Sequence, residues 1–274
     1  MTSSKLHKVA VYRPGMITVG WTRVICKTND YIVKSPKICP GSDAYNEMHL
    51  DQMAVERQIY EHLGAHEGVI SYLGLYNDEG AIKLTRASQG GLEIYITDHD
   101  MPYQLLRASW IRSLIKTFYY IHTRNVLRQD VKLNNILLHH DSVKVIDFAN
   151  GAIFPLDEAM ETICAQDPLS RVDLLGISCV MYSIVAWRVY NFDYFEDNCF
   201  PKYDEIPSTD GLMFREIIDK CWGNHYNNIR ELYEDFQQLD AQQGIFPRVD
   251  FMLWCMGPPM LLFSSQYIRK LMMN

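Results

Sequence analysis

The chain has 274 residues, of which 48% are hydrophobic and 22% charged, a composition typical of a globular protein large enough for two lobes. Its formal net charge of −7 does not favour a surface that binds nucleic acid or an anionic membrane. Seven cysteines are scattered without a C-x-x-C pair, so we expect reduced thiols and no zinc site.

The N-terminal third predicts a small sheet with one main helix. Runs of β-branched and aromatic residues, separated by turn signals, have the composition of strands and lie at residues 17–25, 31–34, 69–73 and 81–85. Between the second and third runs, residues 50–63 carry apolar side chains at helical spacing, and Gly64 closes the helix. The stretch before this helix, residues 36–46, reads as an irregular connection.

Two charged residues stand out in this part of the chain. Glu56 falls on the apolar stripe of the predicted helix, where an unpaired buried charge would be costly, so it needs a cationic partner. Lys34 ends an apolar strand and is the obvious candidate. Each residue also has a simpler explanation, with Lys34 as a solvated strand end and Glu56 as a side chain at the edge of the stripe.

The next part of the chain predicts mainly helices. Residues 108–124 form an amphipathic helix, in which we interpret His122 as a packed or capping residue rather than a catalyst. Residues 172–187 are apolar nearly all round, as in a helix buried in the centre of a lobe. Asp173, at the start of that helix, is expected to cap it or to bond the backbone of a neighbouring loop. Two further helices are predicted at residues 211–222 and 229–239.

The most informative stretch is residues 126–149, V-L-R-Q-D-V-K-L-N-N-I-L-L-H-H-D-S-V-K-V-I-D-F-A. Two short apolar runs flank a polar turn, which predicts a loop that leads into a hairpin. Such a hairpin brings Asp130, Lys132 and Asn135 near Asp147. Two oxygen ligands, a candidate base and a cation suit Mg²⁺ and a triphosphate, because Mg²⁺ is usually held by one or two carboxylates together with substrate phosphates.

These motifs resemble the catalytic loop and metal-binding motif of protein kinases, H-R-D-x-K-x-x-N followed by D-F-G, which in this chain are R-Q-D-V-K-L-N-N and D-F-A. The resemblance extends over residues 19–239. Within the family, the chain resembles the divergent kinase-like proteins of filamentous fungi. It implies an α+β, two-lobed protein kinase-like fold, with a small β-rich N-lobe carrying one main helix and a larger, mainly helical C-lobe. The implied divisions are an N-terminal extension (1–16), the N-lobe (17–87), the C-lobe (88–240) and a tail of unknown role (241–274).

The resemblance also implies roles for the loop residues. Asp130 and Lys132 are the expected catalytic residues. Asp130 would orient the substrate hydroxyl or take its proton, and Lys132 would neutralise charge on the transferred phosphoryl group. Asn135 and Asp147 are the expected metal ligands and also belong to the expected nucleotide site.

The rest of the expected ATP site comes from the N-lobe and the segment that follows it. Lys34, positioned by Glu56, would hold the α- and β-phosphates. Gly20 belongs to the phosphate-covering loop, Leu84 would lie behind the nucleotide, and Ala87 belongs to the hinge.

The chain departs from the family pattern at several positions. The phosphate-covering loop has only Gly15 and Gly20 in place of G-x-G-x-x-G, so any lid is small or stiff. Ala149 replaces the glycine of D-F-G, which restricts the backbone. Arg128 and Gln129 replace His-Arg, and this removes the arginine that reads an activating phosphate.

The activation segment is also reduced. Only 25 residues separate Asp147 from Asp173, and they contain no A-P-E. Glu161 is the best candidate for the glutamate of that motif, and its expected partner is an arginine in the region that contains Arg230. A segment this short gives little platform for a peptide substrate.

Three functions are compatible with this inventory. The first is a phosphotransferase that moves the γ-phosphoryl group of ATP to a protein Ser or Thr hydroxyl with Mg²⁺. The second is a pseudokinase that serves as a nucleotide-binding or scaffold module, and the third is a small-molecule kinase. The expected cofactors are ATP and Mg²⁺, and the expected partner is a protein.

The sequence also bears on location and membranes. Residues 1–14 have no apolar core of the kind a signal peptide needs, and the apolar run at residues 251–263 is too short and interrupted to span a bilayer. We therefore expect a cytoplasmic protein with no membrane span and no nucleic-acid partner. The sequence does not indicate an oligomeric state.

Overall fold

The computed structural model describes residues 16–20, 22–166, 169–197, 199–202 and 204–243. The chain divides into two units, Met1–Leu239 and Asp240–Asn274. The described strands and helices lie in the first unit, except for the end of the last helix. Most of the expected N-terminal extension and the apolar run at residues 251–263 lie outside the described residues.

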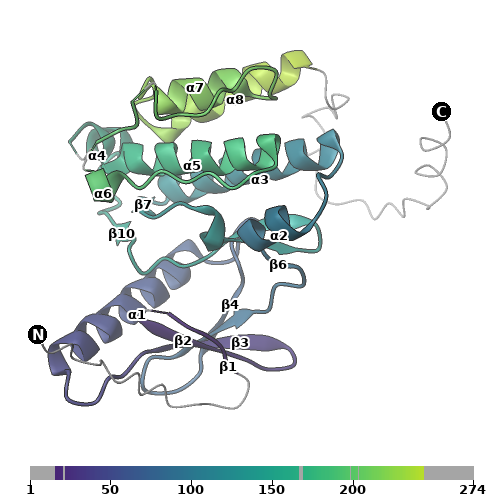
Figure 1. Cartoon of the computed structure of the whole chain (residues 1–274). Helices are drawn as coiled ribbons and strands as arrows, with labels where there is room; N and C mark the ends of the chain where they lie inside the picture. The colour runs from purple at the N-terminus through teal and green to yellow at the C-terminus, as the bar shows by residue number, and fades with distance from the viewer. Residues whose placement is uncertain (1–15, 21, 167–168, 198, 203, 244–274) are drawn as a thin grey trace, which may run out of the picture. The chain divides into compact units, whose positions relative to one another are not determined.

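The N-terminal region is a five-stranded antiparallel sheet with one long helix beside it (Figure 1). The strand order is β1-β2-β3-β5-β4. The bounds are β1 Met16–Val19, β2 Arg23–Lys27, β3 Tyr31–Pro36, β4 Tyr72–Leu75 and β5 Ile82–Thr85. Helix α1, Asp43–Leu63, contacts β3 and buries the stripe predicted from its spacing, which includes Met53, Glu56 and Ile59.

Three predicted boundaries in this region are wrong. The first strand run is two strands because the chain reverses at Gly20, whose N–H donates to the Arg23 carbonyl at 2.9 Å. Helix α1 begins at Asp43, since an acidic residue in the first turn suits the positive end of the helix dipole. Val69 is buried but precedes β4, and it forms an isolated parallel bridge with Val145.

The predicted hairpin is present between the two main regions. Strands β8, Ile136–His139, and β9, Ser142–Val145, pair with β6, Gly90–Gly91, in the order β6-β8-β9. Its turn residues His140 and Asp141 have φ of 49° and 55°, and positive φ at both central positions is what a type I′ hairpin turn requires. Nearby, β7, Val126–Leu127, pairs with β10, Ala152–Ile153, and a short 3₁₀ helix covers Leu133–Asn135.

The C-terminal region is mainly helical, as expected. Its helices are α2 Leu92–Asp98, α3 Gln104–Thr123, α4 Met160–Gln166, α5 Leu169–Ala186, α6 Tyr194–Asp197, α7 Arg215–Trp222 and α8 Ile229–Gln243. Figure 1 shows α3, α5, α7 and α8 stacked together, and α5 contacts both α3 and α7. Among the described helices, α5 alone is long and apolar enough to cross a membrane, but 83% of it is buried inside the fold. It is the central helix of this region.

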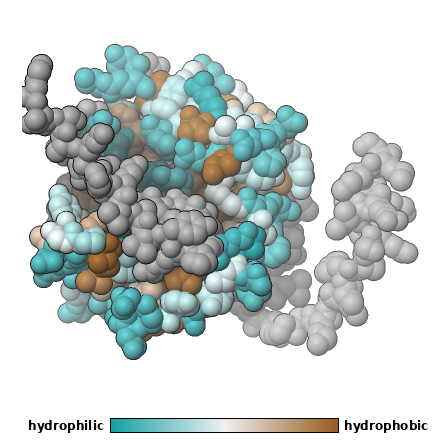
Figure 2. Space-filling model, turned by 60° about the horizontal axis from the view of Figure 1, so that its bottom comes forward, coloured by the Kyte–Doolittle hydropathy of each residue, from teal (hydrophilic) through white to brown (hydrophobic). Residues whose placement is uncertain are grey.

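Exposed hydrophobic side chains are scattered over the surface. Figure 2 shows one face, on which the described hydrophobic residues lie in small separate groups among hydrophilic ones. Scattered apolar residues are normal on a globular domain and need no partner to explain them.

Gly176 brings α5 close to the loop that contains Asp130. A Cβ atom at Gly176 would lie 2.4 Å from the Val131 carbonyl oxygen and 2.6 Å from the Val131 Cβ. Alanine normally favours a helix over glycine by about 1 kcal/mol, but this backbone clash outweighs the gain. We predict that Gly176→Ala lowers the free energy of unfolding by about 1–3 kcal/mol, measured by urea denaturation.

Gly91→Ala is the matched control for this change. An added Cβ at Gly91 meets nothing within 4 Å, and its φ of −75° suits any residue. Equal stabilities for the two variants would show that α5 does not need the close approach at Gly176.

Candidate active site

The expected pair between Lys34 and Glu56 is present in the core. Lys34 Nζ lies 2.7 Å from Glu56 Oε1, and the two residues are 3% and 0% exposed. Such a pair needs close geometry, because burial removes the water that would otherwise stabilise both charges. The pair fixes β3 against α1.

Strand register explains which side chains share a face with Lys34. Ile25 of β2 lies opposite Lys34 of β3, and Ile32 lies opposite Leu84 of β5. Because side chains two apart on a strand point to the same face, Arg23, Lys34 and Leu84 share one face of the sheet. The side chains of Arg23 and Lys34 therefore extend from the same face of the sheet.

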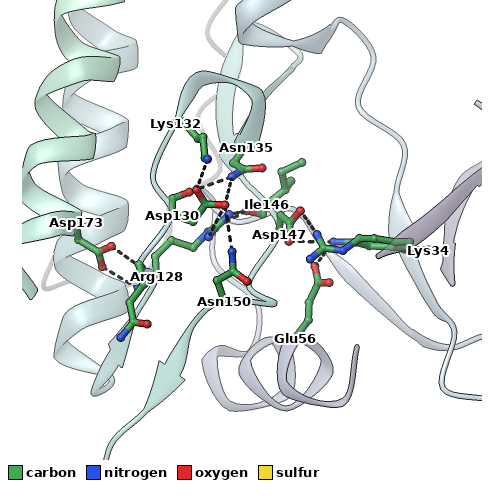
Figure 3. A network of polar contacts seen from close by, with 12 residues as sticks. Lys34, Glu56, Arg128, Asp130, Lys132, Asn135, Ile146, Asp147, Asn150 and Asp173 are labelled. Carbon is green, nitrogen blue, oxygen red and sulfur yellow. Dashed lines mark hydrogen bonds and ion pairs between the residues drawn. The ribbon is translucent and has the colours of Figure 1, made fainter. Parts of the chain in front are cut away.

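Asp147 lies just beyond β9, where the side chain of Lys34 points toward it (Figure 3). Lys34 Nζ is 3.3 Å from Asp147 Oδ1, and Arg23 Nη1 donates to Asp147 Oδ2. Burial alone would raise the pKa of Asp147, but the charges of Lys34, Arg23 and Arg128 hold that pKa well below its usual range. The carboxylate is therefore ionised and carries a cation on each oxygen.

The loop residues expected to be catalytic also come together. Figure 3 shows Lys132 and Asn135 pointing toward Asp130. Lys132 Nζ is 2.7 Å from Asp130 Oδ1, and the Asn135 amide donates to the Asp130 side chain at 3.2 Å and to its carbonyl at 3.0 Å. The Asn135 Nδ2 is thus committed to Asp130, which leaves Asn135 Oδ1 as a possible ligand. A further donor is the Asn150 amide, 3.4 Å from Asp130 Oδ2.

Asp173 holds the backbone of this loop. Its carboxylate is fully buried and accepts the N–H groups of Arg128 at 2.7 Å and Gln129 at 2.6 Å. Asp173 Oδ2 also lies 3.0 Å from His122 Nε2. The expectation that Asp173 bonds a neighbouring loop is confirmed, and His122 is a packed residue, as predicted.

Arg128 has a role that was not predicted from the sequence. It is 1% exposed, and its guanidinium donates to the Ile146 carbonyl at 3.3 and 3.2 Å and lies 5.8 Å from the centre of the Phe148 ring. Arg128 Nη1 is also 3.9 Å from Asp130 Oδ2. One buried arginine therefore links the loop of Asp130 to the segment of Asp147. An arginine directly after two apolar residues, Val126 and Leu127, was the available signal for burial.

The role of Arg23 was not predicted either, because this residue fell inside a predicted strand without an evident partner. The signal was its spacing, since Arg23 lies two residues before Ile25 and so on the face that carries Lys34. A cation on such a face needs an anionic partner, which is Asp147.

Glu161 and Arg230 form the pair expected for the reduced activation segment. Glu161 Oε1 lies 3.0 Å from Arg230 Nη2, but the side chains are 47% and 55% exposed. An exposed pair of this kind contributes about 0–1 kcal/mol. Helix α4 is held instead by apolar packing of Met160, Ile163 and Cys164 against Leu127.

The donor types at Asp147 and Asn135 fit Mg²⁺. Within the described ranges, no three His, Cys, Asp or Glu side chains gather in a way that could hold a metal. A metal at Asp147 and Asn135 would therefore need oxygen ligands from a bound phosphate, which is the usual way that proteins hold Mg²⁺. These donor types suit a metal whose remaining ligands are phosphate oxygens.

A cavity of about 430 Å³ lies beside this cluster, between the first half of α1 and the residues after Phe148. Its lining residues are Ala44, Glu47, Met48, Asp51, Gln52, Val55, Ala149, Asn150 and Gly151. It meets the site at Asn150, which also donates to Asp130.

Of the remaining expected nucleotide contacts, Leu84 is buried on the face of Lys34, and Ala87 is half-buried just after β5. Gly20 is exposed in the turn between β1 and β2. Only three residues separate the end of β1 at Val19 from the start of β2 at Arg23, so any lid formed there would be small.

Comparison with known proteins identifies the family. The sequence model of the protein kinase domain family matches residues 22–186, which are more than half of the chain. The chain belongs to the protein kinase domain family. The two-lobed kinase fold that the motifs implied is thereby confirmed, with its β-sheet N-terminal region and its helical C-terminal region.

The relatives include serine/threonine kinases and a probable inactive one. Plk-1 of Caenorhabditis elegans is 24% identical over 174 residues, which are 56% of this chain and 26% of that protein. PDK1 of Cryptococcus neoformans var. grubii is 33% identical over 146 residues, 45% of this chain and 12% of that protein. A probable inactive serine/threonine-protein kinase of Dictyostelium discoideum is 27% identical over 158 residues, 52% of this chain and 13% of that protein. The chain thus matches only a minor part of each relative's length.

Proposed function

We propose that the chain is a kinase-type phosphotransferase that moves the γ-phosphoryl group of ATP to a protein Ser or Thr hydroxyl, with Mg²⁺. The observation that carries this proposal is the position of Lys34 Nζ, 2.7 Å from Glu56 and 3.3 Å from Asp147. These three residues come from β3, α1 and the segment after β9. Their convergence joins the N-lobe to the C-lobe, where a nucleotide would lie between a lysine for its phosphates and a carboxylate for its metal.

Asp130 is the residue that we assign to the acceptor hydroxyl. Its side chain is 24% exposed, so a substrate can reach it, and Lys132 and Asn135 hold its orientation. Lys132 would neutralise charge on the transferred group, and catalysis would consist of positioning and electrostatic stabilisation. When bound at Asn135 and Asp147, Mg²⁺ supplies positive charge that stabilises the phosphates.

The proposal includes the finer assignments made from the sequence. Leu84 would contact the nucleotide base, Ala87 would contribute backbone groups at the hinge, and Gly20 would face the phosphates from the short turn. The N-lobe is proposed as residues 17–87 and the C-lobe as residues 88–240.

A second candidate is a nucleotide-binding module without phosphoryl transfer. The specific observation in its favour is Arg23, whose guanidinium occupies the Asp147 carboxylate. The small turn at Gly20 also offers few backbone N–H groups to phosphates. The two candidates share a nucleotide site and differ only in chemistry.

ATP with Mg²⁺ is predicted to raise the midpoint of thermal unfolding. At a hundred times the Kd, the gain is about 2.7 kcal/mol, or about 5–10 °C for a domain of this size. Lys34→Met removes the cation assigned to the phosphates, and a charge-assisted hydrogen bond contributes about 1.5–3 kcal/mol, so most of this shift is lost. Each shift is read against the variant's own midpoint without ATP, since the change also leaves Glu56 buried without its partner.

Lys27→Met, at the exposed end of β2, is the matched control and keeps the full shift. Labelled phosphate transferred from γ-labelled ATP to an acceptor protein, together with the shift, supports the kinase. A shift without transfer supports the second candidate. No shift at millimolar ATP contradicts both.

A further inference from the structure

Asp147 already carries two cations. Lys34 Nζ lies 3.3 Å from Oδ1, and Arg23 donates to Oδ2. The side chains of Arg23 and Asp147 are 14% and 22% exposed, so the pair is largely shielded from water. A divalent ion that approached this carboxylate would be repelled by both cations and would compete with them for its oxygens.

We propose that Arg23 is a built-in cation that replaces a divalent metal at Asp147 when nucleotide binds. The site would then bind a nucleoside triphosphate as the metal-free anion, and the Mg²⁺ of the proposed transfer would be needed for the chemical step rather than for binding. This inference rests on the proposed nucleotide site and specifies how that site recognises phosphates.

The balance of charge supports this proposal. Two cationic side chains and two carboxylates lie in one connected cluster: Arg23 and Lys34 with Glu56 and Asp147. Without Arg23 the carboxylates would outnumber the cations, and a triphosphate would need a metal ion before it could approach Asp147. With Arg23 in place, the carboxylates are already balanced.

The chemistry of arginine also suits direct contact with a phosphate. A guanidinium has five N–H donors in a planar fork, and the pair with Asp147 uses a donor at Nη1. The same group can therefore bridge a carboxylate and a phosphate, which arginine binds strongly through paired N–H donors.

The position of Arg23 also compensates for the reduced lid. A glycine-rich loop normally covers the phosphates with backbone N–H groups, but in this chain the turn between β1 and β2 is only residues 20–22. The Gly20 N–H is already used, because it donates to the Arg23 carbonyl at 2.9 Å. Arg23, the first residue of β2, supplies side-chain donors at the point where backbone donors are few.

Binding of a fluorescent ATP analogue to the full chain tests this inference, in buffer with EDTA and in buffer with Mg²⁺. We expect the wild-type protein to bind comparably in both. In EDTA, the affinity of Arg23→Gln for the analogue should be about tenfold or more lower than that of the wild type, because one charge-assisted hydrogen bond is lost. This variant should bind the analogue better with Mg²⁺ than without it. Lys27→Gln, an exposed cation on the same strand, should behave as wild type.

A second variant keeps the test valid if Arg23→Gln does not fold. Arg23→Lys retains the charge at Asp147 with fewer donors, and it should keep metal-free binding at reduced affinity. Strictly Mg²⁺-dependent binding by the wild type would overturn the inference and leave the nucleotide site intact. Tighter binding by Arg23→Gln in EDTA would also overturn it, since Arg23 would then obstruct the site. Absence of wild-type binding in both buffers would overturn the inference together with the proposed function.

Discussion

Replacing Asp173 by alanine is expected to lower the free energy of unfolding by about 3–5 kcal/mol, because it removes one member of a buried polar network. The carboxylate is fully buried and accepts the N–H groups of Arg128 and Gln129 at 2.7 and 2.6 Å. Each buried donor left without an acceptor costs about 1–3 kcal/mol, and His122 would lose its partner as well. Urea denaturation measures the change.

Two further variants define what Asp173 does. Asp173→Asn keeps one side-chain oxygen as an acceptor, so it should lower the free energy of unfolding by less than Asp173→Ala does. Asp210→Ala removes an aspartate that is 87% exposed and paired with Arg215 at 3.3 Å, and it should change stability by less than about 1 kcal/mol. If Asp173→Ala were no more destabilising than Asp210→Ala, the loop of Asp130 would not depend on Asp173.

Sequence patterns predicted the contacts of those charged residues that are buried and therefore require a partner of a particular type. A buried aspartate near the start of a mostly apolar helix has to find donors, and Asp173 finds them in the loop backbone. A glutamate on an apolar helical stripe has to find a cation, and Glu56 pairs with Lys34. The hairpin followed from two apolar runs around a polar turn.

The two arginines could not be assigned in the same way. An arginine side chain is long, and its partner depends on strand register and on which segments pack together, which short-range patterns do not specify. Arg23 reaches Asp147 across 124 positions of the sequence, and Arg128 reaches the Ile146 carbonyl across 18. The boundary errors have a related cause, since composition alone did not reveal the reversal at Gly20.

Both arginines stand where the chain departs from the kinase motifs. Arg128 occupies the place of the histidine in H-R-D, and its guanidinium connects the Asp130 loop to the Ile146 carbonyl. Arg23 follows the short connection between β1 and β2 and neutralises Asp147. Each of these two arginines is a fixed cation that connects segments far apart in the sequence.

Asp130→Asn is expected to have the largest effect on chemistry. If Asp130 takes or orients the proton of the acceptor hydroxyl, the amide lowers kcat by about 10²–10⁴-fold, the usual contribution of a positioned base. Asn135 holds Asp130 through its carbonyl as well as its side chain, at 3.0 Å and 3.2 Å, so the loop keeps an anchor in the variant. ATP affinity should stay within about twofold of wild type, because an effect confined to the transition state changes kcat alone.

Steady-state transfer from γ-labelled ATP, combined with nucleotide titration of the same preparation, measures both quantities. Asp141→Asn, in the exposed turn of the neighbouring hairpin, is the matched control and should retain wild-type transfer. An Asp130→Asn protein that transferred phosphate at the wild-type rate would remove Asp130 from the reaction. A variant that lost ATP binding in parallel with transfer would instead make Asp130 part of the nucleotide site, because the defect would then lie in binding rather than in the chemical step.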